Sequence, residues 1–285
     1  MNQKEQKWLV LLYSLNELGG GGQRSMILQH INDCAYWYKN DNNDTLRRTR
    51  NEMAWRNDFS FERQHLVEQG YMKTGGQGNW EITDKGKRHL SALIEKAKHQ
   101  TNGENICYTA VFFQKLFPSQ KTLIELEEDQ LLIAELSLAD NTAVITHPPL
   151  INEPRPVGSL SNRSTSGPIY SRAPKVARAA LSRAGYLCEV DSTHQSFLRR
   201  DGTTLYMEPH HLIPMSLTDF FGVDLDREQN IFSLCSNCHN QIHYGVKEDV
   251  QRLVAKLFLS REQEICAILG RTISIEELYR IYKVY

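Results

Sequence analysis

Side chains that can bind metal ions are concentrated in one stretch of the sequence, residues 188–243. This stretch holds three of the six cysteines and five of the ten histidines of the chain. The residues are Cys188, His194, His210, His211, Cys235, Cys238, His239 and His243. Thiolate and imidazole groups are the ligands that zinc and related divalent ions prefer in proteins. The stretch therefore predicts metal binding.

The spacing of these residues indicates two ions. Cys238 and His239 are neighbours on a predicted helix, and neighbouring helical side chains point about 100° apart. The thiol pair Cys235/Cys238 and the histidines therefore serve two different ions most simply. His239 and His243 are four residues apart and project from one helix face. A strand alternates its faces, but at a strand end His210 and His211 can serve one site, one as a metal ligand and one as a base.

This combination of groups is typical of phosphodiester hydrolysis. A histidine near its ordinary pKa of about 6.5 can take a proton from water at neutral pH. A divalent cation beside it can stabilise the phosphorane and the leaving 3′-oxygen. The alternative interpretation is a structural zinc finger in a non-catalytic DNA-binding regulator. That alternative leaves four histidines without a role, so we favour catalysis.

The elements expected around the histidines are a strand at 204–208, a second strand at 230–234 and a helix that follows it. Their motifs are E-x-H-H-L-I-P, then Asn230, then L-C-x-x-C-H-x-x-x-H. On these motifs, residues 172–250 resemble the HNH endonuclease family, and in particular restriction-type members that carry a structural zinc. The resemblance implies a ββα-metal core, a β-hairpin followed by a helix around one catalytic divalent cation, here Mg²⁺ or Mn²⁺.

The resemblance also implies a role for each motif residue. His211 would be the general base, and His210 and His239 would bind the catalytic ion. His243 would complete the coordination or hold the scissile phosphate, and Asn230 would brace the loop between the strands. Glu208 precedes His210 by two residues, on the same strand face, where it can orient an imidazole by a hydrogen bond. The candidate catalytic residues are thus His211, His210, Asn230, His239, His243 and Glu208.

The structural zinc site departs from the common family pattern, in which two C-x-x-C pairs supply the ligands. Only Cys235 and Cys238 form such a pair here. Cys188 is followed by Asp191 three residues later and by His194 six residues later. Cys188, His194, Cys235 and Cys238 would make a chemically sensible Cys₃His zinc site. Asp191 competes with His194 for the fourth position.

The N-terminal residues 1–98 have a different pattern. We expect three helices, a hairpin around the glycine-containing turn 74–79, and a final helix, which is the order typical of a winged-helix domain. The expected helices are residues 7–19, 25–31, 51–68 and 83–98. The run of four glycines, 19–22, is expected to end the first helix.

Residues 50–86 resemble the N-terminal winged-helix domain of Mrr-type restriction proteins. The likeness lies in the third helix, the "GY" at the start of the hairpin and the "W-x-I-T-x-x-G" at its end. It implies that the helix before the wing reads DNA, with Arg50, Arg56, Arg63 and Gln64 as candidate contacts. A winged helix that binds a protein partner is the alternative.

The composition restricts the class of protein and its compartment but does not identify a reaction. The 285 residues carry 33 Lys+Arg against 34 Asp+Glu, a net charge of −1, so no global basic field indicates a nucleic-acid partner. No apolar run is long enough for a membrane helix and the N-terminus lacks a signal-peptide core, so we expect a cytoplasmic protein without membrane contact. In that compartment six cysteines favour metal binding or free thiols over disulfides.

Together these patterns predict an α+β protein of four parts. They are a winged-helix DNA-recognition domain (1–98), a connecting helical and acidic region (99–146), a proline-rich linker (147–171) and an HNH nuclease domain with a zinc knuckle (172–285). In the nuclease domain we expect trailing helices at 247–258, 261–269 and 275–282.

The predicted function is a metal-dependent restriction endonuclease in host defence. It would act on double-stranded DNA, leave a 5′-phosphate and a 3′-hydroxyl, and either spare or require methylated sites. One active site per chain cuts one strand, so we expect a homodimer.

Overall fold

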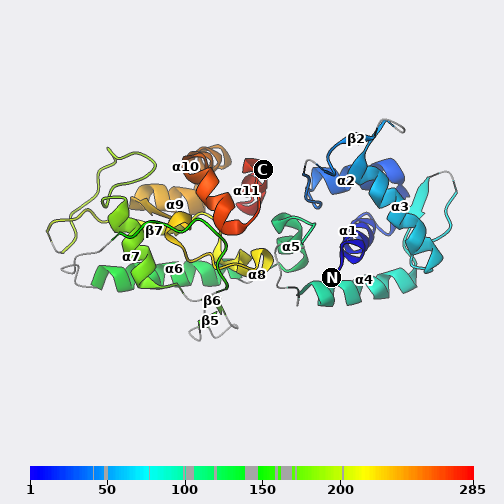
Figure 1. Cartoon of the computed structure of the whole chain (residues 1–285), viewed down its shortest axis with the longest axis horizontal. Helices are drawn as coiled ribbons and strands as arrows, with labels where there is room; N and C mark the ends of the chain where they lie inside the picture. Colours follow the sequence, from blue (N-terminus) through cyan, green and yellow to red (C-terminus); the bar gives the residue numbers. More distant parts are fainter. Residues whose placement is uncertain are drawn as a thin grey trace. The chain divides into compact units, whose positions relative to one another are not determined.

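Helices dominate the structure, and its described strands are only two to four residues long. The computed structural model describes the chain except for residues 41, 48–50, 77, 99, 101–105, 119–120, 139–146, 158–159, 162–168, 171 and 201. The chain divides into two units, Met1–Pro118 and Ser119–Tyr285, and each is described by itself (Figure 1). This is the helix-rich α+β class that the sequence predicted; the predicted domain limits stay a prediction.

The first unit packs the apolar faces of its helices around Leu9, Ile27, Trp55, Phe59 and Leu66, each at most 2% exposed. Two short antiparallel sheets flank this core, β1 with β4 and β2 with β3. In chain order the elements are α1 (Gln3–Glu17), β1 (Gly21–Gln23), α2 (Arg24–Asp33), β2 (Leu46–Arg47), β3 (Glu52–Met53), α3 (Ala54–Glu68), β4 (Asn79–Glu81), α4 (Asp84–Lys98) and α5 (Ala110–Leu116).

The glycine run does more than end the first helix. Gly19 and Gly20 have φ values of 81° and 101°, a left-handed conformation that glycine adopts at little cost. They turn the chain so that Gly21–Gln23 pairs with Asn79–Glu81. A Cβ atom at Gly21 would lie 2.9 Å from the Trp80 carbonyl oxygen, so this pairing requires glycine. In the described part of the expected hairpin, Met72 and Ile82 form a bridge, with backbone bonds from Lys73 to Glu81 and from Thr83 to Tyr71.

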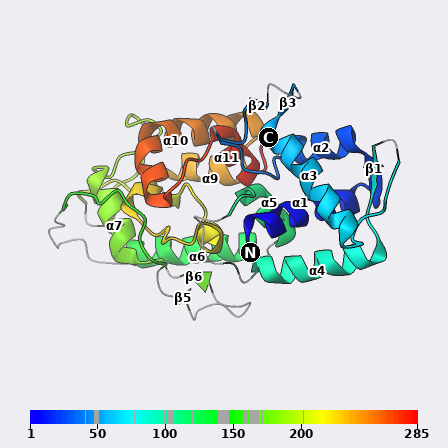
Figure 2. The ribbon, with the colours of Figure 1, turned by 45° about the vertical axis from the view of Figure 1, so that its right-hand side comes forward.

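The second unit is built around a two-stranded antiparallel sheet, β7 (Glu208–His211) and β8 (Ile231–Leu234), in which Glu208 lies opposite Leu234. The helix α9 (Ser236–Tyr244) follows directly. The other elements are α6 (Lys121–Leu138), β5 (Leu160–Ser161), β6 (Ile169–Tyr170), α7 (Pro174–Arg183), a 3₁₀ turn (Met215–Leu217), α8 (Thr218–Phe221), a second 3₁₀ turn (Glu228–Asn230), α10 (Lys247–Leu269) and α11 (Ile275–Ile281). In both views α6 and α10 lie on opposite sides of β7 and α9 (Figures 1 and 2).

Two expected boundaries in this unit need correction. The strand expected at 204–208 is wrong: the ladder with β8 starts at Glu208, while Leu205 makes only an isolated bridge to Leu198. The helices expected at 247–258 and 261–269 form one element, α10, with a non-helical backbone at Arg261. The guanidinium of Arg261 donates to the carbonyl oxygens of Glu228 and Ile231 at 2.9 and 3.0 Å, which ties this kink to the start of β8.

Among the helices of the described residues, none has the length and apolar character needed to cross a membrane.

Candidate metal centres and active site

Three buried thiols and one imidazole meet beside the first turn of α9. The ligand atoms of Cys188, His194, Cys235 and Cys238 all lie within 4.8 Å of one another. Cys235 is the N-cap of α9 and Cys238 lies in its first turn, so the helix start sets the spacing of this pair. Cys188 follows the turn after α7, where Gly185 and Tyr186 both have positive φ.

The distances in this cluster fit a tetrahedral ion. With Zn–S of about 2.3 Å and Zn–N of about 2.0 Å, a sulfur and a nitrogen on one zinc lie about 3.5 Å apart. Nδ1 of His194 is 3.7 Å from Cys235 Sγ and 3.3 Å from Cys238 Sγ. Asp191 instead accepts from the backbone and the hydroxyl of Thr193 and is exposed. The structure therefore brings His194, and not Asp191, to the thiols.

The thiols differ in their electrostatics. Burial opposes ionisation of Cys188, but backbone N–H groups near Cys235 and Asp191 outweigh it and lower the pKa of Cys188 to about 7. Burial and the adjacent Cys188 thiol raise the pKa of Cys238. Three buried thiols at this separation repel one another once they ionise, and a bound cation would relieve that repulsion. The donor set thus suits a metal such as zinc.

A second cluster consists of histidines alone. The ligand atoms of His210, His239 and His243 lie within 4.8 Å of one another. Nε2 of His239 is 3.3 Å from Nε2 of His243, and two nitrogens held by one ion at about 2.1 Å lie about 3.0–3.5 Å apart. His210 and His239 are buried, whereas His243 is exposed. The helix α9 therefore contributes residues to both clusters: Cys238 belongs to the cysteine cluster and the adjacent His239 to the histidine cluster.

Hydrogen bonds fix which nitrogen each buried histidine offers. Glu208 Oε2 accepts from Nδ1 of His239 at 2.6 Å, which leaves Nε2 of His239 facing His243. The Tyr282 hydroxyl donates to the Leu212 carbonyl at 2.8 Å, so it accepts from Nε2 of His210 at 2.9 Å. Nδ1 of His210 is buried and bonds to no group among the described residues. A lone pair without a partner at this point fits a metal ligand.

Charge in this cluster also suits a cation. Burial and the neighbouring imidazoles hold the pKa of His210 well below its ordinary value, so the ring is neutral at pH 7. Burial raises the pKa of Glu208, but the bonds from His239 and Ser236 outweigh it and lower this pKa overall. Neutral imidazoles backed by a carboxylate are the form that binds divalent ions.

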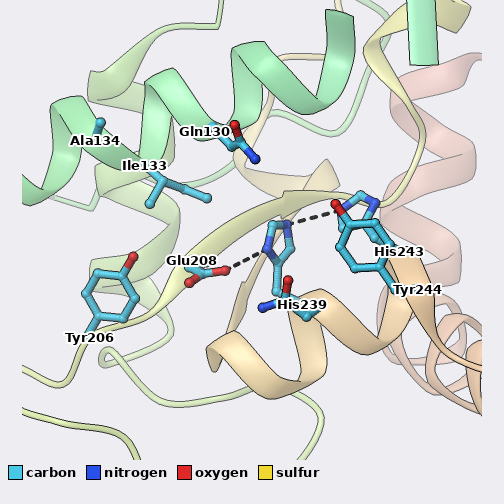
Figure 3. A pocket seen from close by; sticks show the side chains of 9 residues that line it. Gln130, Ile133, Ala134, Tyr206, Glu208, His239, His243 and Tyr244 are labelled. Carbon is cyan, nitrogen blue, oxygen red and sulfur yellow. Dashed lines mark hydrogen bonds and ion pairs between the residues drawn. The ribbon is translucent and has the colours of Figure 1, made fainter. Parts of the chain in front are cut away.

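His239 and His243 line a pocket of about 370 Å³. Tyr206, Glu208, His239, Asn240, His243 and Tyr244 form one side, and Gln130, Ile133 and Ala134 of α6 form the other. In Figure 3, His239 stands between Glu208 and His243, with α6 facing them across the pocket. The cysteine cluster contributes no residue to this lining.

His211 and Asn230 lie beside the cluster, outside the group of three. His211 is buried and its Nε2 is 3.0 Å from Asp226 Oδ1. Asn230 is fully buried, accepts from the Ile213 N–H at 2.7 Å and donates to the carbonyl oxygens of Ile213 and Leu225 at 2.9 Å. It therefore ties the loop after β7 to the loop before β8.

In the first unit the candidate DNA contacts have different surroundings. Gln64 is exposed on α3, and its side-chain amide donates to Glu68 of the next turn. Arg63 donates to the Lys73 carbonyl at 3.2 Å, and Arg56 lies over the Trp55 ring. Arg50 lies outside the described residues.

The sequence pattern missed Asp226 and Tyr282, which bond to two of the histidines. Asp226 comes four residues before Asn230, and Tyr282 follows the last helix by one residue. Neither spacing is a recognisable signal, because both contacts join segments that are distant in the chain.

Two comparisons with known proteins found similarity over part of the chain. Residues 6–92 match the Mrr N-terminal domain. The chain is also 30% identical over 92 residues to the type IV methyl-directed restriction enzyme EcoKMcrA of Escherichia coli (strain K12). That alignment covers 32% of this chain and 30% of the relative. Both matches agree with the restriction-type resemblance that the sequence motifs indicated.

Proposed function

We propose that this chain is a metal-dependent DNA endonuclease of the HNH type that acts in restriction. The observation that carries the proposal is the cluster of His210, His239 and His243, of which His239 and His243 line a pocket. His211 follows His210 on β7. The likeness to a restriction enzyme supports the same class of activity. A purely structural zinc finger would need the cysteine cluster but not this second group.

Each cluster would hold one ion. Cys188, His194, Cys235 and Cys238 would bind a structural Zn²⁺. His210, His239 and His243 would bind Mg²⁺ or Mn²⁺. When bound, this second ion would supply electrostatic stabilisation of the charge that develops on the phosphate and the leaving oxygen. Glu208 would keep His239 oriented through the 2.6 Å bond to its Nδ1.

His211 would act as the general base. It would take a proton from a water molecule, whose oxygen attacks the phosphorus. The bond to the 3′-oxygen breaks, and the products carry a 5′-phosphate and a 3′-hydroxyl. Asn230 would hold the two loops that flank His211 through its three hydrogen bonds.

The N-terminal unit would choose the target. We propose that residues 1–98 form a winged-helix domain whose α3 approaches double-stranded DNA through Arg56, Arg63 and Gln64, with Arg50 as a further contact. Residues 172–285 would then form the nuclease domain, and two chains would act together to cut both strands. Analytical ultracentrifugation with a duplex oligonucleotide tests the predicted homodimer.

Plasmid cleavage tests the proposal directly. Purified protein is incubated with methylated and with unmethylated plasmid, in Mg²⁺, in Mn²⁺ and in EDTA. Because the relative is described as methyl-directed, the methylated plasmid is the first substrate. We expect metal-dependent cutting that EDTA abolishes. His211→Ala should lower the rate at least about 100-fold with DNA binding kept.

His147→Ala is the matched control, since His147 lies in the same unit, is exposed, hydrogen-bonds to Ser182 and belongs to neither cluster. It should cut at the wild-type rate. If wild type cuts neither plasmid while it retains DNA binding and bound zinc, the chain is a non-catalytic regulator.

A further inference from the structure

A buried carboxylate lies against the proposed general base. Oδ1 of Asp226 is 3.0 Å from Nε2 of His211, and both residues are 6% exposed. An ionised carboxylate only accepts hydrogen bonds, so Nε2 of His211 is the donor in this bond. In the neutral form of the ring, Nδ1 then carries the lone pair. It is buried and bonds to no group in the described part of the chain.

The carboxylate is itself held firmly. Its second oxygen, Oδ2, accepts from the backbone N–H of Ala173 at 2.6 Å, at the start of α7. The backbone N–H of Asp226 donates to Asp224 Oδ1 at 2.9 Å. On the other side, Asn230 bonds to the Leu225 carbonyl. Asp226 therefore has little freedom to turn away from His211.

A segment from outside the ββα core adds to this hold. Arg155 donates to Asp224 Oδ2 at 2.6 Å and to the Asp226 carbonyl at 3.3 Å. The N–H of Asp224 donates back to the Arg155 carbonyl at 3.0 Å. Arg227 donates to the Ile151 carbonyl at 2.6 Å. Residues 151–155 thus hold the loop that carries Asp226 in place through hydrogen bonds.

We propose that Asp226 is a positioning residue for His211. It holds the imidazole in the tautomer whose Nδ1 takes the proton from water. This inference rests on the proposed nuclease function. One water O–H bond breaks, its proton goes to Nδ1, and the water oxygen bonds to phosphorus. The P–O3′ bond breaks with its electron pair on the 3′-oxygen, which takes a proton from solvent, and His211 returns its own proton to solvent. Asp226 stabilises the intervening imidazolium without taking a proton.

Asp226→Asn tests the tautomer. The amide oxygen of the variant keeps the bond from the Ala173 N–H, which turns the amide NH₂ toward Nε2 of His211. Nε2 must then accept, and the proton moves to Nδ1, where it blocks base catalysis. By analogy with the wrong-tautomer variant of serine proteases, kcat should fall about 100- to 10,000-fold. KM for DNA should change less than about threefold, because Asp226 is buried and not exposed at the surface that DNA would contact.

Two readouts separate positioning from a merely structural role. The first is the ¹⁵N spectrum of His211 in the zinc-containing protein with Mg²⁺, assigned by comparison with His211→Ala. Wild type should show a protonated Nε2 and an unprotonated Nδ1, and Asp226→Asn the reverse. The second is Asp249→Asn, which removes a surface carboxylate of the same unit and should leave kcat, KM and the spectrum unchanged.

The outcomes are distinct. Wild type that cuts DNA, with Asp226→Asn equal to it in kcat, overturns this inference and leaves the nuclease intact. A wild-type spectrum with the proton on Nδ1 overturns it as well, whether or not the variant folds. Wild type without metal-dependent cleavage removes the proposed function and this inference together.

Discussion

The cysteine cluster and the histidine cluster share one helix but differ in every property that matters for chemistry. Cys235 and Cys238 lie at the start of α9 with their sulfurs buried, whereas His243 one turn later is exposed at a pocket. The cysteine cluster offers four ligand atoms, enough for a tetrahedral site. The histidine cluster offers three, so an ion bound there would keep coordination positions for water or a phosphate oxygen.

The difference shows how one short helix can contribute residues to two separate clusters of possible metal ligands. Adjacent residues on a helix diverge by about 100°, so Cys238 and His239 reach opposite surroundings. Soft thiolates in a closed site suit zinc, whereas imidazoles are borderline ligands that bind several divalent transition-metal ions. If the two clusters have these separate roles, a substitution in the cysteine cluster should lower stability and zinc content, whereas one in the histidine cluster should lower the cleavage rate.

Cys235→Ser should have the largest effect. Loss of one thiolate would release the zinc, and a structural zinc contributes about 10–16 kcal/mol of binding free energy, as much as the whole stability of a typical domain. We expect the second unit to unfold. Zinc per chain by elemental analysis and the thermal melt by circular dichroism measure this. Cys266→Ser, on α10 and outside both clusters, is the control and should keep its zinc and its Tm.

His239→Ala should abolish cleavage but leave the fold. The side chain belongs to the histidine cluster, so under the proposed function its loss would remove one ligand of the catalytic ion, while the four residues of the cysteine cluster stay. We expect a rate at least about 1,000-fold lower in Mg²⁺, with zinc content and Tm close to wild type. A variant that lost its zinc along with its activity would show that the two clusters are one functional unit.

Glu208→Gln should have an intermediate effect. The carboxylate that accepts from Nδ1 of His239 becomes a weaker acceptor, so the imidazole binds the ion less well. Loss of such an orienting bond typically costs about 10- to 100-fold in metal affinity or activity. The Mn²⁺ concentration that gives half-maximal cleavage measures it. Glu276→Gln, exposed on α11, should not move that concentration; an unmoved value for Glu208→Gln would remove this role.

Tyr282→Phe should have the smallest effect. It removes the hydroxyl that accepts from Nε2 of His210 and leaves the ring in place. A hydrogen bond of this kind contributes about 1 kcal/mol, which corresponds to about a fivefold rise in the half-activating Mn²⁺ concentration. Tyr285→Phe, which is 60% exposed, is the control. Equal values for the two variants would mean that His210 needs no orienting partner.

Local pattern predicted most of the helices of this chain. The apolar spacing in residues 7–19 and 83–98 agrees with α1 and α4 to within four residues at each end. The break between 258 and 261 corresponds to the kink at Arg261. These features depend on contacts between residues close in the sequence, which is why periodicity detects them.

Strands were harder to predict than helices. Thr204–Glu208 has the β-prone residues, yet the ladder forms at Glu208–His211 because the register with Ile231–Leu234 decides it. The pairing of Gly21–Gln23 with Asn79–Glu81 had no sequence signal, since glycine lowers the strand propensity of a segment. The position of a strand depends on its pairing with a second segment, and the sequence of one segment alone does not give that pairing.

The sequence by itself determined which chemistry the second unit can carry, because thiolate and imidazole groups are metal ligands and their helical spacing places them on defined helix faces. Only the tertiary structure decided which atoms meet. It brought His194 rather than Asp191 to the thiols, Tyr282 to His210, Asp226 to His211 and α6 to the pocket. The bond between His210 and Tyr282, for example, joins residues 72 positions apart. No local pattern encodes these contacts, since they follow from packing of the whole unit.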